Sequence, residues 1–323
     1  MKIFVYTATL LGAVIGAGFV GGKEIVLFFD GSITGILQFA VVFALCCCIS
    51  VKRIADTHSH TLPQLLKNTT PDFTRWLFSA SYLVVLTTML CGANDCFTML
   101  TEINLPIGAV IVSLVCVAVM RKEKGMEIFN CIAVPLIVVF LIVALMSLPE
   151  TPPIHTQSTV TQTPIVYALF NYAMCLSVLG SCTPSKNKFV PTLLCTVVIA
   201  LLIGALAMRI DDVTAIQPLP LLYLLKDNTV LYSFGIVAMC LAIVTSVLAN
   251  LCSLTAELTA ITKDRSFSLM AILSFCSILS VGGYDTIVKY CYPFIALLGL
   301  FVALCCTVKT VIKKTVNVRS LSR

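Results

Sequence analysis

The sequence predicts an all-α membrane protein with ten transmembrane helices, and three observations carry this prediction. Of the 323 residues, 59% are hydrophobic and only 11% are charged, whereas a water-soluble chain has about 25% charged residues. The apolar residues are gathered in runs long enough to cross a bilayer as helices. The Lys and Arg residues lie mostly in alternate loops between these runs, as in proteins that cross a membrane repeatedly.

Ten hydrophobic spans follow one another along the chain. In order they are residues 3–29, 32–51, 76–101, 105–120, 126–148, 164–183, 189–208, 232–257, 267–284 and 287–309. With the first residue in the cytoplasm, 17 of the 21 Lys and Arg residues fall in cytoplasmic segments. This split predicts a bacterial inner-membrane protein with both termini in the cytoplasm. The net charge of +6 is then a sign of membrane topology, so we expect the lipid bilayer as a partner and no nucleic acid.

A polar linker, residues 149–163, divides the spans into five and five. The expected organisation is a first repeat at 1–148, a second at 164–309 and a basic cytoplasmic tail at 310–323. Because five is odd, the second half enters the membrane from the opposite side, which makes the repeat inverted. In proteins built this way, substrate is held where the first helix of each half is interrupted.

The first span is crowded with glycines, at positions 12, 16, 18, 21 and 22. Glycine destabilises a helix interior by about 1 kcal/mol and frees the backbone to unwind. A break at Gly16-Ala17-Gly18 would expose amides and carbonyls to an ion or a carboxylate, and a half-helix beginning near Phe19 would direct its positive end at an anion. The same glycines also suit close helix packing. The span is too long for the apolar core of a cleaved signal peptide.

Polar residues at membrane depth mark three further places. Glu24, beside Lys23, ends the first span and is a candidate gate, although both charges could instead reach water. The sixth span carries Asn171, Tyr172 and Ser177, with Gly180-Ser181 able to relax the helix. The eighth carries Thr245 and Ser246, whose hydroxyls suit a small hard cation such as Na⁺ but can also bond back to their own helix. These are the candidate binding residues outside the first span.

Other chemistries have little support. The sixteen cysteines lie mostly in apolar spans, where free cysteine packs as a small hydrophobe. We therefore expect no cofactor, and no metal beyond a coupling ion. The chain has no HExxH, GxSxG or Walker sequence, so we expect no enzyme. A GxGxxG string at residues 16–21 lacks the strand–turn–helix setting of a dinucleotide site.

Residues 12–25 with Phe28-Phe29 resemble the opening of the YkvI-type bacterial membrane proteins, whose pattern there is close to GAGFASGQEI. The segments 89–94 and 105–106 are also similar to theirs. Those proteins resemble distant members of the amino acid–polyamine–organocation superfamily, with the LeuT-type five-plus-five fold. The resemblance implies broken first and sixth helices around a central substrate site, with the third and eighth helices beside it.

The resemblance also implies roles for individual residues. The substrate would contact residues of the first and sixth helices: Gly16, Ala17, Gly18, Phe19, Asn171, Tyr172 and Ser177. In sodium-coupled relatives one ion lies between the first and eighth helices, and the matching positions here are Gly12, Ile15, Ala242, Thr245 and Ser246. We thus expect a secondary transporter of a small solute, an amino acid or similar zwitterion, coupled to Na⁺ or alternatively H⁺. The rival hypothesis is a non-transporting receptor subunit on a transporter fold, as in spore germination.

Overall fold

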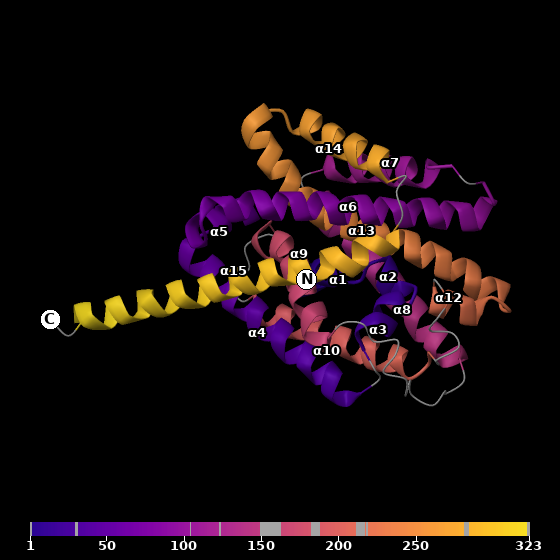
Figure 1. The fold of residues 1–323 in the computed structure, drawn as a ribbon, viewed down its shortest axis with the longest axis horizontal. Helices are drawn as coiled ribbons and strands as arrows, with labels where there is room; N and C mark the ends of the chain where they lie inside the picture. The colour runs from indigo at the N-terminus through magenta and orange to yellow at the C-terminus, as the bar shows by residue number, and fades with distance from the viewer. Residues whose placement is uncertain are drawn as a thin grey trace.

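The computed structural model describes residues 2–29, 32–103, 105–122, 124–148, 163–181, 188–210, 217, 219–280 and 284–321, and all of its regular elements are helices (Figure 1). In chain order they are α1 (Lys2–Val14), α2 (Ala17–Val20), α3 (Lys23–Phe28), α4 (Ile33–Thr57), α5 (Leu62–Thr69), α6 (Asp72–Thr101), α7 (Ile107–Met120), α8 (Gly125–Ser147), α9 (Pro164–Ser181), α10 (Phe189–Ala207), α12 (Pro220–Leu225), α13 (Thr229–Thr262), α14 (Arg265–Leu279) and α15 (Tyr284–Leu321).

Each predicted span contains a helix, but not all the helices are long. Within the described residues, six are long and apolar enough to cross a membrane: α4, α6, α8, α10, α13 and the 291–312 part of α15. The apolar helices α1, α7, α9 and α14 are shorter. The 14 residues of α7 extend only about 21 Å, against a hydrocarbon core of about 30 Å. Helix length therefore does not confirm ten membrane-crossing helices.

Exposed apolar rows show which surfaces the membrane covers. On α4, residues Ile33, Leu37, Val41 and Leu45 recur every four residues, and each is more than half exposed. Similar rows occupy the outer faces of α8 and α10. Surfaces of this size and composition are unfavourable in water and are satisfied by lipid. The chain is a multi-pass helical membrane protein.

Two helices begin before the apolar spans that predicted them, because polar caps start them earlier. Asn228 accepts a hydrogen bond from the Leu231 amide at 3.1 Å, so α13 begins at Thr229. Asp264 accepts from the Ser266 amide at 2.8 Å and so starts α14. A side-chain acceptor at the N-cap satisfies amides that have no partner inside the helix. Hydropathy alone does not detect these capped polar turns.

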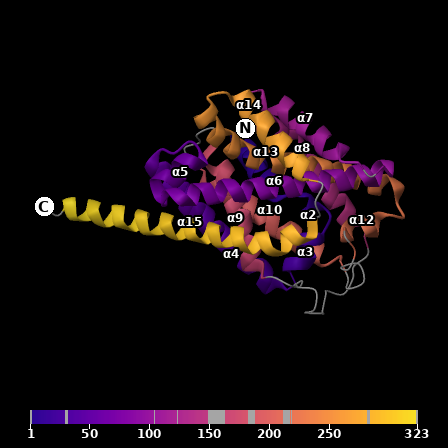
Figure 2. The same ribbon diagram turned by 45° about the horizontal axis from the view of Figure 1, so that its top comes forward.

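The packing brings the two halves of the sequence together. Helix α1 packs against α8 and α13, α9 lies against both α4 and α15, and α6 runs along α13. Figures 1 and 2 show the C-terminal part of α15, which includes residues 310–321 of the predicted basic tail, as a helix extending away from the bundle. The residues around the first-helix glycines are thereby enclosed on several sides.

The sixth span corrects one prediction. Helix α9 is continuous from Pro164 to Ser181, so the described residues show no break at Asn171 or at Gly180-Ser181. Gly180 destabilises the helix by only about 1 kcal/mol. Packing of α9 against α4 and α15 offsets a cost of this size. Residues 182–187 and nearly all of the predicted linker 149–163 lie outside the described residues.

Candidate functional site

The first span is broken, but slightly before the predicted position Gly16-Ala17-Gly18: the break lies at Ile15 and Gly16, and Ala17 and Gly18 already belong to α2. Helix α1 ends at Val14 and α2 begins at Ala17. Gly16 is extended (φ −95°, ψ −176°), and its amide donates to the Val14 carbonyl at 3.0 Å rather than to the residue four positions back. The Gly12 carbonyl is therefore released from the helical pattern and faces a neighbouring helix. Such released carbonyls are suited to binding cations.

The neighbouring helix is α13, which presents the predicted Thr245-Ser246 pair. Both residues are buried. The Ser246 hydroxyl donates to the Gly12 carbonyl at 3.4 Å, and a Cβ on Gly12 would lie 3.1 Å from the Thr245 Cβ. Thr245 itself bonds back to the Ala242 carbonyl at 2.9 Å. The structure thus brings together Gly12, Ala242, Thr245 and Ser246, while Ile15 lies buried at the break itself.

One polar residue beside this pair was missed by the sequence analysis. Asn130 of α8 is fully buried, and its Oδ1 lies 3.2 Å from the position that a Gly12 Cβ would take. An asparagine within the first third of an otherwise apolar span is the signal that would have found it. Because α8 was interpreted only as a lipid-spanning helix, its polar residue received no role.

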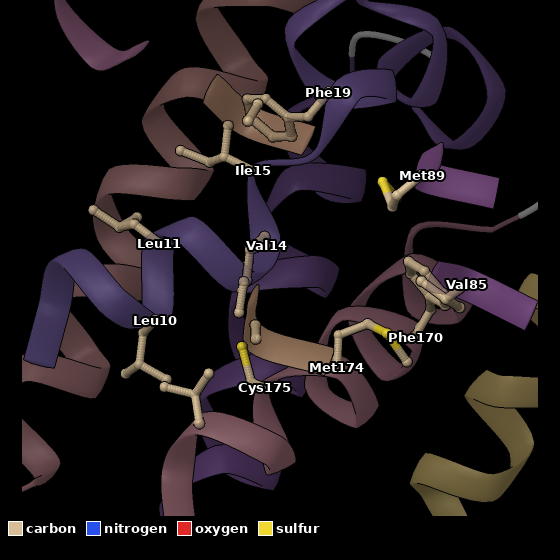
Figure 3. Close-up of a cluster of buried hydrophobic side chains, with 14 of the residues drawn as sticks. Leu10, Leu11, Val14, Ile15, Phe19, Val85, Met89, Phe170, Met174 and Cys175 are labelled. Atoms are coloured by element: carbon tan, nitrogen blue, oxygen red, sulfur yellow. The ribbon is translucent and has the colours of Figure 1, made fainter. Parts of the chain in front are cut away.

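The residues predicted to bind substrate divide into two groups. Gly16, Ala17, Gly18 and Phe19 are all buried at the break. Figure 3 shows apolar side chains on one side of Ile15 and Phe19: Val85 and Met89 from α6, and Phe170 and Met174 from α9. The Met89 Cε lies 3.4 Å from the position of a Cβ on Gly16. These four apolar residues, which the sequence analysis did not select, form with the break what we call the central apolar cluster.

The polar residues of α9 have protein partners instead. Asn171 donates to the Tyr167 carbonyl at 2.9 Å, and Ser177 donates to the Met174 carbonyl at 2.7 Å. Tyr172 shares a hydrogen bond of 2.6 Å with Ser50 of α4. The structure therefore does not gather their polar atoms at the break, and their role in binding substrate remains a prediction.

Glu24 is buried rather than exposed to water at the end of the span. Tyr167 of α9 donates to its Oε2 at 2.6 Å, and Tyr292 of α15 donates to its Oε1 at 2.9 Å. A Cβ on Gly18 would lie 2.7 Å from Oε1, so the missing side chain at Gly18 makes room for the carboxylate. This Glu24 cluster joins α3, α9 and α15 directly beside the break. Glu24 therefore does not extend to water, whereas its neighbour Lys23 is half-buried.

Aromatic packing connects the Glu24 cluster with the central apolar cluster. Tyr292 is stacked on Phe170 with ring centroids 3.7 Å apart, and Phe28 lies 4.8 Å from Tyr167. Aromatic rings in such contact exclude water from the carboxylate and stiffen the arrangement. Tyr292, which bonds to Glu24 and stacks on Phe170, thus joins the two clusters directly.

The two ends of the bundle differ. Where α6 begins and α13 ends, Arg75 forms an ion pair with Glu257 at 2.5 Å. Where α6 ends and α13 begins, a cavity of about 250 Å³ is lined by residues of α6, α12 and α13 and the segments before them: Met99, Gln217, Leu219, Leu222, Tyr223, Lys226 and Tyr232. None of the predicted substrate residues lines this cavity.

Comparison of the sequence with known proteins assigns the chain to no family. No family model matches the chain. A relative, an uncharacterized protein named YyaD from Bacillus subtilis (strain 168), is 25% identical over 331 aligned residues, with 94% of this chain and 96% of the relative covered. This match assigns no family, and membership of the YkvI-type family remains a prediction.

Three solved structures share the architecture at low identity. MhsT in complex with L-phenylalanine has a TM-score of 0.67 at 13% identity, covering 93% of this chain and 88% of MhsT. Mhp1, a nucleobase-cation-symport-1 family transporter in a closed conformation, has a TM-score of 0.61 at 14% identity, with 94% and 77% covered. An outward-open Na⁺-coupled sialic acid symporter scores 0.60 at 12% identity, with 94% and 78% covered. The chain therefore has the LeuT-type fold of these proteins.

Proposed function

We propose that the protein is a secondary active transporter of a small solute that works by alternating access. The observation that carries the proposal is the break in the first helix, whose released Gly12 carbonyl meets the Ser246 hydroxyl of α13 at 3.4 Å inside a LeuT-type fold. Irregular backbone at membrane depth is tolerated where it is buried in protein or lines a binding cavity. We further propose that all ten spans cross the bacterial inner membrane as two inverted five-helix repeats, with both termini in the cytoplasm.

The oxygen atoms around the break favour sodium as the coupling ion. The groups near the break are a backbone carbonyl and two hydroxyls, all neutral oxygen donors, which bind hard cations. None of them takes up a proton near neutral pH. A proton-coupled mechanism would instead need a titratable group, and Glu24 of the buried Glu24 cluster is the residue that would serve it.

The central apolar cluster supports a substrate with an apolar part. Val85, Met89, Phe170 and Met174 lie together on one side of the break, and none of them is charged (Figure 3). The solved relative MhsT is described with L-phenylalanine bound, and we extend that chemistry to this chain as a proposal. An apolar amino acid or a similar zwitterion would place its side chain in this cluster and its polar groups against the exposed backbone at Gly16.

The structure corresponds to a state in which the centre is covered. The predicted substrate residues are buried. The Glu24 cluster closes one side of the break and the Arg75–Glu257 pair holds helices together at the far end of α6. Transport would require these two contacts to open in alternation.

The test is uptake into liposomes with an imposed sodium gradient, using labelled apolar amino acids. The double substitution Thr245→Ala with Ser246→Ala removes both hydroxyls, so sodium-dependent uptake should fall by about tenfold or more, since an unmet oxygen ligand costs about 1–3 kcal/mol. The matched control is Thr192→Ala with Thr196→Ala on α10, whose hydroxyls bond only to their own helix; it should transport normally.

Two other outcomes would redirect the proposal. Uptake that survives the double substitution but follows an imposed pH gradient would exclude sodium coupling and favour Glu24 as the proton carrier. Purified protein that binds a solute without any counterflow across the liposome membrane would instead identify a receptor on a transporter fold.

A further inference from the structure

Asn130 is an unusual residue in the interior of this protein. It lies on α8, is 0% exposed, and neither its Oδ1 nor its Nδ2 has a hydrogen-bond partner. Among the side chains that the structure describes, it is the one that leaves two buried polar atoms unpaired. A buried amide without partners costs about 1–3 kcal/mol for each unmet group. Such a residue persists where a ligand supplies the missing partner.

The position of Asn130 identifies what that ligand contacts. A Cβ built on Gly12 would lie 3.2 Å from the Asn130 Oδ1 and 3.1 Å from the Thr245 Cβ. The absent side chain of Gly12 therefore lets α8 and α13 approach the same point of α1. Asn130 of α8 and the Thr245-Ser246 pair of α13 therefore both lie against Gly12, whose carbonyl the break releases.

A purely structural role does not account for this asparagine. Asparagine can hold membrane helices together, but it does so by hydrogen bonding across the helix interface, and Asn130 makes no such bond in the described residues. Asn250, on the α13 face one turn after Ser246, likewise has an unpaired Oδ1, although its Nδ2 donates to the Ser246 carbonyl at 3.1 Å. Two unpaired amide oxygens therefore flank the Thr-Ser pair.

We propose that the Asn130 Oδ1 is a direct ligand of a small monovalent cation bound between α1, α8 and α13. The site then consists of the Gly12 carbonyl, the Thr245 and Ser246 hydroxyls and the Asn130 amide oxygen, all of them neutral. With no carboxylate among these donors, the site suits a monovalent ion such as Na⁺ better than a divalent one, whose binding sites use carboxylates. The inference rests on the proposed sodium coupling and extends its site to a third helix.

The site also has a mechanical consequence. An ion that touches α8 as well as α1 and α13 ties the first helix to the fifth span, so its release frees α1 from both. Because an amide does not titrate, the affinity of this site should be the same at pH 6 and pH 8. A site that depended on Glu24 would respond to pH.

The test measures ²²Na⁺ binding to purified protein, which needs no knowledge of the substrate. Asn130→Leu keeps the approximate shape of the side chain but removes both polar atoms, and we expect sodium affinity at least tenfold weaker than in wild type. Asn130→Asp keeps the oxygen and should bind sodium at least as tightly as wild type. Thr196→Val on α10 is the matched control for replacing a buried polar group, and its sodium affinity should be unchanged.

Folding is checked by thermal unfolding without sodium, where Asn130→Leu should be at least as stable as wild type because it removes two unpaired polar atoms. Wild-type affinity in Asn130→Leu, or loss of sodium binding in a folded Asn130→Asp, overturns the role of Asn130 while leaving sodium coupling intact. If wild type binds no sodium, both the site and sodium coupling are wrong, and transport by another ion is decided separately by liposome uptake.

Discussion

At the scale of single residues, Gly22 shows how the turn that follows the break is built. It joins α2 to α3 with φ +81°, in the left-handed region that side chains other than glycine rarely adopt. A Cβ there would also lie 2.9 Å from the Ile210 Cδ1 and 3.2 Å from the Leu221 amide nitrogen. That amide donates to the Gly21 carbonyl at 2.9 Å and so ties α12 to the joint. Backbone conformation and close packing both require glycine at this position.

Replacing Gly22 by Ala should therefore destabilise the fold by about 1–3 kcal/mol, the cost of a strained backbone position. Thermal unfolding in detergent, in the absence of sodium, measures the change. The control is Gly204→Ala in the interior of α10, where the nearest atom to the new Cβ is the end of the Ile36 side chain at 3.3 Å. A helical site of this kind should be neutral or gain up to about 1 kcal/mol. Equal melting temperatures for the two variants would contradict the assignment.

Glu24 illustrates a different kind of residue, one that is costly and yet retained. A carboxylate in a dry interior is unfavourable unless its oxygens are met by donors. Here the two tyrosine hydroxyls meet both oxygens, and each tyrosine comes from a different helix. The cluster is consequently a single point on which the closure of α3, α9 and α15 depends. This supports the gating role proposed for Glu24.

At the scale of elements, the Arg75–Glu257 pair fastens the start of α6 to the end of α13. The two partners are unequal, because the Arg75 side chain is 30% exposed and that of Glu257 only 9%. Removal of Glu257 leaves an arginine that can extend to water, whereas removal of Arg75 leaves an unpaired carboxylate in a buried place. The asymmetry in exposure therefore predicts an asymmetry in stability.

Arg75→Gln should accordingly lower the free energy of unfolding more than Glu257→Gln does. We expect a difference of about 1–2 kcal/mol after allowance for the exposure of the arginine. The double variant should resemble Glu257→Gln, since neither charge is then buried alone. Chemical or thermal unfolding of the three variants in one detergent provides the comparison. Equal losses in the two single variants would mean that Glu257 is solvated when Arg75 is absent, and the pair would then contribute little as a fastening.

Elements also show which parts of the fold were predictable. The helices, the break in the first span and the Thr245-Ser246 pair were evident from hydropathy, glycine content and local polarity, because each depends on residues close in sequence. The continuity of α9 was not predictable from its sequence. A glycine only permits a break, and packing against α4 and α15 determines whether the helix breaks. The starts of α13 and α14 depend on caps at Asn228 and Asp264, which lie outside the apolar runs.

At the scale of the whole molecule, the candidate site depends on contacts between distant residues. Glu24 and Tyr292 are 268 positions apart, and Gly12 and Ser246 are 234 apart. The sequence resemblance placed the second contact correctly, because it came with a family pattern. The resemblance gave no pattern for the contact between Glu24 and Tyr292, and none for Asn130. The position of Asn130 beside Gly12 follows only from how the helices pack. Local patterns thus predicted the parts of the site, and tertiary packing determined how they combine.

The proposed mechanism makes a prediction about the molecule as a whole. If an ion ties α1 to α8 and α13, then losing it should let α1 move away from α9, with which it also packs. Cys175 of α9 is fully buried beside Val14 and Leu10 of α1 (Figure 3). Without sodium, the open state becomes more populated, and the Cys175 thiol should react with a water-soluble maleimide several-fold faster than with sodium present.

Labelling at each cysteine can be followed by mass spectrometry of the digested protein, with potassium replacing sodium to hold ionic strength constant. Cys116 of α7 is equally buried but lies outside the proposed path, so it should label slowly under both conditions. Parallel acceleration at Cys116 would indicate general loosening rather than an opening at α1. An unchanged rate at Cys175 would mean that α1 stays in place when the ion leaves, and the coupling between ion and first helix would have to be abandoned.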